Sequence, residues 1–296
     1  MRILLTGADG ILGQKLVLKI LAEKDYDLGL FVRGEKEMFF ELPIDIFRGD
    51  LLDNPSLEAA TEGMETVIHL AGLTHAHESE SYYKINTLGT KNLLDACRKS
   101  QVKRFIFISS RAAGLNGGAY AKSKFLAEEE VAKSGLDWVI LRLSEVYGAG
   151  EKEAVSKLIR IIKSSYFVPI IGSGQFRLAP IFSDDAIDGI LKVLKKSAVN
   201  KKIYNLAGPE EITYSELVDK LLKEMRLKRV KIFLPVVLIR IILGIFSLAG
   251  IDIFVKDQLP RLLSEKSSDI SQAVRDFNFQ PRDLDAGLKE VLNFLQ

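Results

Sequence analysis

Short apolar runs alternate with longer amphipathic segments along the first half of the chain. Runs rich in Val, Ile, Leu and Phe predict buried parallel strands, whereas apolar residues three or four positions apart predict helices. The predicted strands cover residues 2–5, 28–32, 44–47, 66–70, 104–108 and 138–141, and the predicted helices cover residues 13–22, 83–99 and 120–133. This alternation indicates an α/β fold, a doubly wound parallel sheet with helices on both faces.

The alternation weakens after about residue 148, where helical patterns dominate. We therefore predict a first domain over residues 1–148 and a smaller, mostly helical substrate region over residues 149–296, some segments of which return to the main domain.

The apolar stretch 232–251 lies in this second region. Its length would suit a membrane span, but Arg240 near its middle would be costly in lipid. We favour a buried or substrate-covering helix, and a helix lying on a membrane surface is the main alternative.

The composition is that of an ordinary globular protein. The 296 residues are 47% hydrophobic and 27% charged, and the formal net charge is +2, which gives no electrostatic basis for nucleic-acid binding. Cys97 is the single cysteine, and the three histidines lack carboxylates at ligand spacing, so we expect neither a disulfide framework nor a metal site. No signal peptide is visible, and we expect a cytoplasmic protein.

Glycines at positions 7, 10 and 13 follow the first predicted strand and open the first predicted helix. Such a turn needs residues that tolerate positive φ, and side chains there would keep a phosphate away from the backbone N–H groups of the helix. At this place in an alternating chain the spacing is typical of a dinucleotide-binding Rossmann fold. We predict that the diphosphate is bound by Gly7, Asp9, Gly10, Ile11, Leu12 and Gly13.

Later strand ends complete the predicted dinucleotide site. The second strand is followed by Arg33, whose charge and fork geometry suit the 2′-phosphate of NADP, whereas an acidic residue there would favour NAD. We therefore favour NADP over NAD, and stacking of Arg33 on the adenine of either cofactor is the alternative. After the third and fourth strands, we predict cofactor contacts for Asp50, Leu51, Leu70, Ala71 and Gly72.

Tyr120 and Lys124 are four residues apart in a predicted helix, so their side chains share one face. A lysine beside a tyrosine, together with a nicotinamide ribose, favours the deprotonated phenol, and the tyrosine can then exchange a proton near neutral pH. The serines Ser109 and Ser110 end the strand just before this helix. Together with the glycine loop, these residues point to hydride transfer coupled to proton transfer.

The chain resembles the extended short-chain dehydrogenase/reductases of the NAD-dependent epimerase/dehydratase family. Specific matches are TGADGILG at 6–13, HLAG at 69–72, FIFISS at 105–110, YAKSK at 120–124 and LRLSEVYG at 141–148, and looser ones follow at 180–191, 204–218 and 277–292. The resemblance implies that Tyr120 is the catalytic acid/base and that Lys124 holds the nicotinamide ribose. It also implies that Ser110 bonds the reacting oxygen, with Ser109 as a weaker candidate, and that Asn86 has a partly structural role beside the cofactor.

Some positions depart from the family pattern. Tyr120 follows Ser110 by only ten positions, whereas related sugar-nucleotide epimerases have a longer, substrate-holding loop there. In addition, Leu143 occupies a position where proline is usual. For Arg111 we weigh contact with an anionic substrate against simple exposure to solvent. We also predict substrate contacts for Thr74, His75 and Arg177.

Two functions of different classes fit these observations. The first is an NAD(P)-dependent epimerase, dehydratase or reductase that acts on a hydroxyl or keto carbon of a small molecule, with a nucleotide sugar as the expected substrate. The second is an NADPH-binding structural or regulatory protein that resembles an accessory subunit of respiratory complex I and has no turnover. The resemblance also implies that a homodimer can form through the helices at 83–99 and 120–133, which pair across a two-fold axis in this family.

Overall fold

The computed structural model describes residues 1–34, 39, 41–148, 150, 154–241, 258–264 and 266–294. Its main feature is a seven-stranded parallel sheet with the order β11-β6-β5-β4-β1-β2-β3. The strands are β1 (Arg2–Thr6), β2 (Asp27–Val32), β3 (Asp45–Arg48), β4 (Thr66–His69), β5 (Arg104–Ser110), β6 (Asp137–Leu143) and β11 (Lys202–Leu206). The predicted doubly wound parallel sheet is confirmed, since the strand order reverses between β1 and β4.

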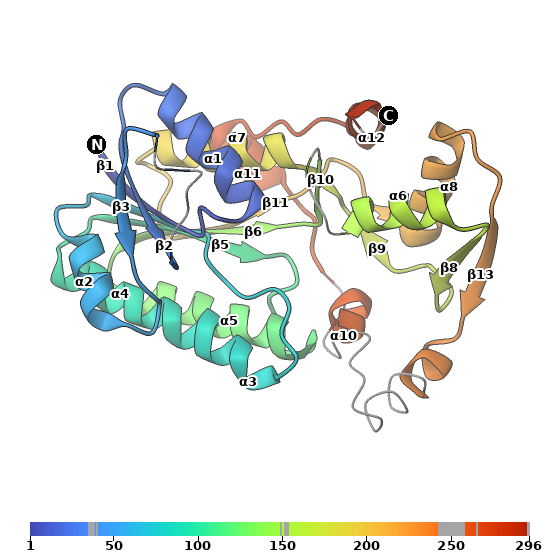
Figure 1. The fold of residues 1–296 in the computed structure, drawn as a ribbon, viewed down its shortest axis with the longest axis horizontal. Coiled ribbons are helices and arrows are strands. Elements are labelled where there is room, and N and C mark those ends of the chain that lie inside the picture. Colours follow the sequence, from blue (N-terminus) through green and yellow to red (C-terminus); the bar gives the residue numbers. More distant parts are fainter. Residues whose placement is uncertain are drawn as a thin grey trace.

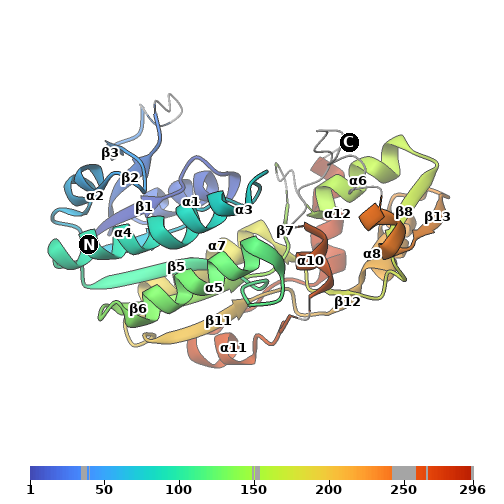
Figure 2. The same cartoon turned by 90° about the horizontal axis from the view of Figure 1, so that it is seen from below.

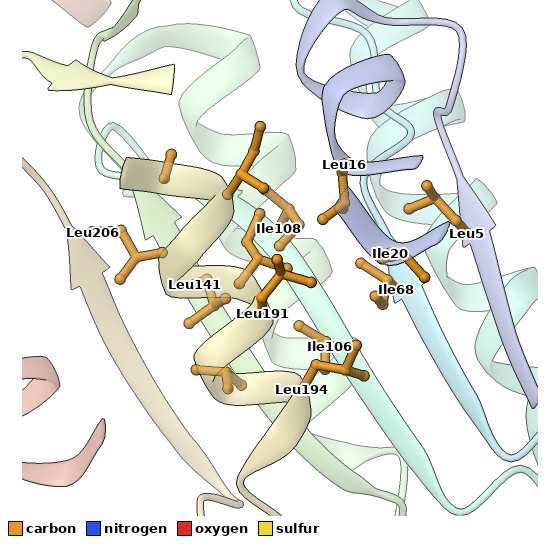
Figure 3. Close-up of a cluster of buried hydrophobic side chains, with 14 of the residues drawn as sticks. Leu5, Leu16, Ile20, Ile68, Ile106, Ile108, Leu141, Leu191, Leu194 and Leu206 are labelled. Carbon is orange, nitrogen blue, oxygen red and sulfur yellow. The ribbon is translucent and has the colours of Figure 1, made fainter. Parts of the chain in front are cut away.

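Helices cover both faces of this sheet (Figure 1). On one face lie α1 (Ile11–Ala22), α7 (Ser183–Lys195) and α11 (Ser271–Phe277), and on the other lie α2 (Asn54–Thr61), α4 (Gly89–Lys99) and α5 (Gly118–Lys133). Figure 3 shows the first of the two cores, where Leu16 and Ile20 of α1 and Leu191 and Leu194 of α7 pack on Ile106 and its neighbours. The central strands are buried from both sides, which explains their continuous apolar runs.

The helix predicted over residues 83–99 is interrupted. The chain first forms α3 (Ser79–Tyr82), then a π-helical segment, η2 (Tyr83–Leu88), and only then α4. A π-helical segment inserts an extra residue into the helical repeat and is frequent at functional sites. Here it contains Asn86, which is buried.

The C-terminal half forms a smaller lobe. Its core lies among α6 (Ala154–Ser164), α8 (Tyr214–Glu224) and α12 (Leu284–Phe294). Short strand pairs accompany these helices: β7 (Val146–Tyr147) with β10 (Ile181–Phe182), β9 (Arg177–Leu178) with β12 (Ile212–Thr213), and β8 (Phe167–Ile171) with β13 (Val230–Leu234). From the same half of the chain, β11 joins the main sheet, and α7 and α11 pack on it. Between the lobes lies α10 (Gln258–Leu263), beside α5 (Figure 2).

The apolar stretch 232–251 does not form one buried helix. Residues 232–234 belong to β13, and residues 236–241 are helical but expose apolar side chains, such as Val237 at 66%. For the described part, the predicted burial is therefore wrong, the other half of that prediction, a substrate-covering helix, stays a prediction, and 242–251 lie outside the described residues. Within the described part of the chain, no helix is long and apolar enough to cross a membrane.

Candidate functional site

The predicted functional residues gather at the carboxyl edge of the parallel sheet. The register aligns Thr6 of β1 with His69 of β4, so these two strands end at the same level, and it aligns His69 with Phe107 of β5, which continues beyond them to Ser110. The strand order reverses between the neighbouring strands β1 and β4, and the helices that follow these two strands lie on opposite faces of the sheet. Such a switch point leaves an opening at the strand ends and is the usual position of a ligand in this architecture.

Two of the three loop glycines are required by the packing of the protein itself. Gly7 has a φ of +76°, and a Cβ atom there would lie 2.5 Å from the backbone nitrogen of Ala71. A Cβ on Gly13 would lie 2.2 Å from the carbonyl oxygen of Gly7. Both glycines therefore allow β1, the loop after β4 and the start of α1 to approach closely.

Gly10 is different, because nothing in the protein forbids a side chain there. It has an extended conformation with a φ of −73°, and a Cβ atom would meet only the oxygen of Gly7, at 3.5 Å. Gly10 caps α1 without a side-chain hydrogen bond, and the first turn of this helix has no acidic residue. The missing side chain thus leaves space in front of the N–H groups of Ile11, Leu12 and Gly13, as a bound diphosphate requires.

A buried histidine joins the glycine loop to the segment after β4. The ring of His69 shares hydrogen bonds with Thr6 Oγ1 at 2.7 Å and with Thr90 Oγ1 at 3.0 Å. Burial, reinforced by the charge of Lys124, lowers the pKa of His69 to about 3, so the ring is neutral. The same Thr6 hydroxyl accepts a hydrogen bond from the backbone N–H of Ala71 at 3.2 Å. The network fixes the loop that contains Leu70, Ala71 and Gly72.

Asn86 connects this loop to helix α5. Its amide Oδ1 accepts a hydrogen bond from the backbone N–H of Leu73 at 2.7 Å, and its Nδ2 donates to the Leu73 carbonyl and to Ser123 Oγ, both at 3.0 Å. A Cβ on Gly72 would lie 3.2 Å from Asn86 Oδ1 and 3.9 Å from Lys124 Nζ. The structure therefore supports a positioning role for Asn86.

The predicted adenosine contacts lie at the ends of β2 and β3. Arg33 is exposed directly after β2. The Asp50 carboxylate accepts a hydrogen bond from the N–H of Leu52 at 2.9 Å, which shapes the turn after β3. Leu51 is 7% exposed and packs beside Gly89 at the start of α4. Asp9 is exposed in the glycine loop, where its carbonyl accepts from Gln14 Nε2.

The two serines at the end of β5 have separate environments. The hydroxyl of Ser109 is buried and donates to Glu128 Oε1 at 2.6 Å, and Arg142 binds the same carboxylate. Ser110 is only partly buried, and its Oγ accepts from the N–H of Ala112 at 3.1 Å. Ser109 is therefore engaged in a structural ion-pair network, and Ser110 is the serine available at the edge.

Tyr120 and Lys124 lie on one face of α5 and are both buried, with 8% and 5% exposure. The Tyr120 ring packs edge-on against Tyr82, with 5.9 Å between centroids. Lys124 Nζ donates to the carbonyl of Ile108 at 2.9 Å and lies 4.1 Å from the centre of the Phe107 ring. Burial lowers the pKa of Lys124 to about 7, although the charge of Glu128 opposes this change. The lysine is thus desolvated beside the expected reaction centre, where it can change its protonation state near neutral pH.

One cation near the tyrosine has no counterpart in the predictions from sequence. The guanidinium carbon of Arg261, in α10, lies 4.7 Å from the centre of the Tyr120 ring, and its Nη1 donates to the Thr74 carbonyl at 3.5 Å. Arg261 therefore covers one face of the Tyr120 ring in a cation–π contact. No local sequence pattern predicts this contact, because Arg261 lies 141 residues after Tyr120 in the chain and follows an apolar stretch without a motif.

The structure separates the predicted substrate residues. Thr74 and His75 lie in the loop after β4 and share a hydrogen bond of 3.0 Å between Oγ1 and Nδ1. Arg177 lies in the smaller lobe and is 67% exposed, with Glu211 as an ionic partner at 3.5 Å. Arg111 neither reaches solvent nor points into an open site, because its side chain is 2% exposed and forms an ion pair with Glu145 at 2.9 Å.

The Glu145 carboxylate contacts cations and a backbone N–H group from both lobes. Besides Arg111, it lies 3.7 Å from Lys266 and accepts from the N–H of Ala179 at 3.4 Å. Arg111 also donates to Ser268. Burial alone would raise the pKa of the Glu145 carboxyl, but Arg111 and Lys266 outweigh it and hold this pKa below its usual range. Among the residues that the structure describes, no group of His, Cys, Asp or Glu side chains could hold a metal ion.

Comparison with known proteins shows the family to which the chain is similar. A model described as the NAD dependent epimerase/dehydratase family matches residues 3–207. The chain is 25% identical over 322 residues to a UDP-glucose 4-epimerase of Vibrio cholerae, and the alignment covers 99% of this chain and 95% of the relative. It is 27% identical over 254 residues to an N-acetyl-alpha-D-glucosaminyl-diphospho-ditrans,octacis-undecaprenol 4-epimerase of Escherichia coli O157:H7, with 79% and 75% covered.

A solved structure extends the match to the whole fold. It is the UDP-glucuronic acid 4-epimerase of Bacillus cereus in complex with UDP-glucuronic acid and NAD. The two structures agree with a TM-score of 0.80 at 22% identity, and the match covers 100% of this chain and 99% of the other. The smaller lobe therefore belongs to the shared architecture, beyond the residues that the family model matches.

Proposed function

The chain belongs to the NAD-dependent epimerase/dehydratase family, and from this premise we propose that it is an enzyme that transfers a hydride at a hydroxyl or keto carbon of a nucleotide sugar. One observation carries the proposal: Tyr120 and Lys124 are buried one helical turn apart at the carboxyl edge of the sheet, beside a glycine loop with room for a diphosphate. The names of the two UDP-sugar 4-epimerases among the similar proteins support the substrate class.

The residues of this chain divide the proposed chemistry among them. When bound, the nicotinamide supplies the group that accepts or returns the hydride. Tyr120 accepts the proton of the substrate hydroxyl through its phenol oxygen and returns it when the carbonyl is reduced. Ser110 donates a hydrogen bond to the reacting oxygen, and Lys124 and Arg261 stabilise the negative charge that develops on Tyr120. The buried site around Tyr82 excludes water from these steps.

For the cofactor, we propose NADP. Arg33 is exposed at the end of β2, where the 2′ position of the adenosine ribose lies in this fold, and a guanidinium suits a phosphate there. NAD is the alternative, and it is the cofactor present with the B. cereus enzyme. The family itself uses NAD or NADP, so the choice depends on this one position.

Replacing the phenol tests the enzyme against the alternative of a cofactor-binding protein without turnover. We expect Tyr120→Phe to lower the rate of nucleotide-sugar conversion, or of reduction of the bound cofactor, by about 10²- to 10⁴-fold. Dinucleotide affinity, measured by titration, stays within a few-fold of the parent, because the hydroxyl is not needed to hold the diphosphate. Tyr26→Phe, at a half-buried tyrosine next to the amino end of β2, is the matched control and keeps full activity.

A parent protein that binds the dinucleotide but never changes its redox state with any nucleotide sugar would support the alternative. The same holds if Tyr120→Phe and the parent have equal activity. Release of the nucleotides that co-purify with the protein, followed by mass measurement, identifies cofactor and sugar nucleotide independently of the variants.

A further inference from the structure

The smaller lobe exposes an apolar face that its own fold leaves uncovered. Of the sixteen large hydrophobic side chains that are exposed in the described part of the chain, eight lie at residues 166–167 and 230–241. These eight are Tyr166, Phe167, Val230, Ile232, Phe233, Val237, Leu238 and Ile241, with exposures from 40% to 66%. We call them the apolar face.

Secondary structure brings the apolar face together. Strands β8 and β13 form a two-stranded parallel sheet in which Val230 is the register partner of Phe167. The buried residues of β8, Val168 and Ile170, point to the core of the lobe, so Phe167 lies on the opposite side. The helical residues 236–241 continue directly from β13, which lies at the outer margin of the molecule (Figure 1). An exposed apolar edge of this kind favours association unless another surface covers it.

The charged residues around the apolar face indicate what kind of surface covers it. Residues 154–171 and 220–241 contain ten Lys or Arg and a single Glu, whereas the whole chain has a net charge of +2. Asp219 pairs with Lys231 and Asp285 with Lys220, and with these two carboxylates included the net charge is still +7. Each apolar segment has an exposed cation next to it: Lys163 before Tyr166, Lys228 before Val230, and Arg240 within the helical residues. Apolar side chains flanked by Lys and Arg are typical of segments that lie in the interface of an anionic lipid bilayer.

Other occupants fit less well. A second copy placed edge to edge on β13 would bring two regions of net positive charge into contact, which like-charge repulsion opposes. A nucleic acid would satisfy the cations, but the aromatic rings are not arranged as a stacking platform: Tyr166 meets Phe167 edge-on, with 5.4 Å between centroids and 84° between ring planes. We propose that the apolar face docks this protein on an anionic membrane surface as a peripheral protein, without spanning it.

The inference is independent of the proposed enzymatic function, because vesicle binding needs no turnover. The test is flotation of the full chain with vesicles of phosphatidylcholine, with and without about 30 mol% phosphatidylglycerol. We expect binding only to the anionic vesicles, weakened at least about tenfold when the salt concentration rises from about 0.1 M to about 0.5 M. The double variant Phe233→Glu/Val237→Glu should lose most of this binding.

Leu18→Glu is the matched control, because Leu18 is 62% exposed on α1, far from the apolar face, and it should bind vesicles like the parent. Absence of binding by the parent to anionic vesicles, or equal binding by the double variant and the parent, overturns the proposal. So does a dimer of the parent in sedimentation velocity that the double variant abolishes, since the face would then belong to a second copy. The salt dependence of the parent keeps the test valid if the double variant does not fold.

Discussion

At the residue scale, the site depends on a few buried polar groups whose charge is controlled by their surroundings. Burial lowers the pKa of Lys124 to about 7 and that of His69 to about 3. Lys124 therefore differs from an ordinary surface lysine, which stays protonated until about pH 10.4. Arg33, in contrast, is exposed and can respond directly to the phosphate of a cofactor.

Arg33→Ala should distinguish the two roles considered for this arginine. Because a hydrogen bond to a charged group contributes about 1.5–3 kcal/mol, loss of a phosphate contact should weaken NADPH binding by about 10- to 100-fold and leave NADH binding nearly unchanged. Fluorescence titration with both cofactors measures this. Lys19→Ala, at an exposed lysine of α1, serves as the control for the loss of a charge. Equal weakening for NADPH and NADH would point to adenine stacking instead.

Lys124→Met should reveal the unusual protonation of this lysine. The unfolded chain keeps the lysine proton up to the model value of 10.5, while the folded protein releases it near 7, so unfolding takes up a proton between these values. The free energy of unfolding of the parent should therefore rise with pH in this window, by at most about 1.4 kcal/mol per pH unit, relative to the Met variant. Urea unfolding at both ends of the window measures it. Parallel pH profiles would show that the folded protein keeps the proton.

At the element scale, the junction of β1 with α1 combines two kinds of glycine. Gly13 is needed for contact between parts of the protein, whereas a Cβ atom on Gly10 would make only an ordinary contact with the oxygen of Gly7. The π-helical segment η2 contacts two parts of the site. Its Asn86 accepts a hydrogen bond from the loop after β4 and donates one to Ser123 of α5. Both elements thus connect the cofactor side of the site with the catalytic helix.

The two glycines give a matched pair of variants. Gly13→Ala places a Cβ atom 2.2 Å from the oxygen of Gly7, a backbone atom that cannot easily move, so we expect a loss of about 1–3 kcal/mol in stability. Gly10→Ala has ordinary contact distances and a permitted φ, so its stability should change by less than about 1 kcal/mol while dinucleotide affinity falls at least about tenfold. Thermal unfolding and dinucleotide titration separate the two effects. Normal dinucleotide binding by Gly10→Ala would remove the glycine loop from the site.

At the scale of the whole molecule, two lobes meet around the buried carboxylate of Glu145. Its partners come from the loop after β5, from the smaller lobe and from the segment that follows α10. The same C-terminal segment brings Arg261 over Tyr120. The surroundings of Tyr120 therefore include Arg261, which lies beyond the 3–207 region matched by the family model. A homodimer through α4 and α5 stays a prediction.

Glu145→Gln should measure how strongly the lobes depend on this ion pair. The change keeps the shape but leaves Arg111 buried without a carboxylate, and removing one partner of a buried pair typically costs about 3–5 kcal/mol. Denaturant unfolding measures the loss. Glu58→Gln, which removes the exposed ion pair with Lys99, should cost less than about 1 kcal/mol. Equal effects of the two substitutions would mean that Glu145 contributes no more than a surface pair.

The sequence by itself determined the alternation of strands and helices, the glycine junction and the tyrosine–lysine pair, because these are local patterns with fixed periods. It could not determine that Ser109 binds Glu128, that Arg111 is buried on Glu145, or that Arg261 lies over Tyr120, since these contacts join residues 19, 34 and 141 positions apart. The burial predicted for the stretch 232–251 was wrong over its described part for the same reason. Its hydrophobicity resembles that of a core segment, and only the packing of β13 on β8 decided which side chains remain exposed.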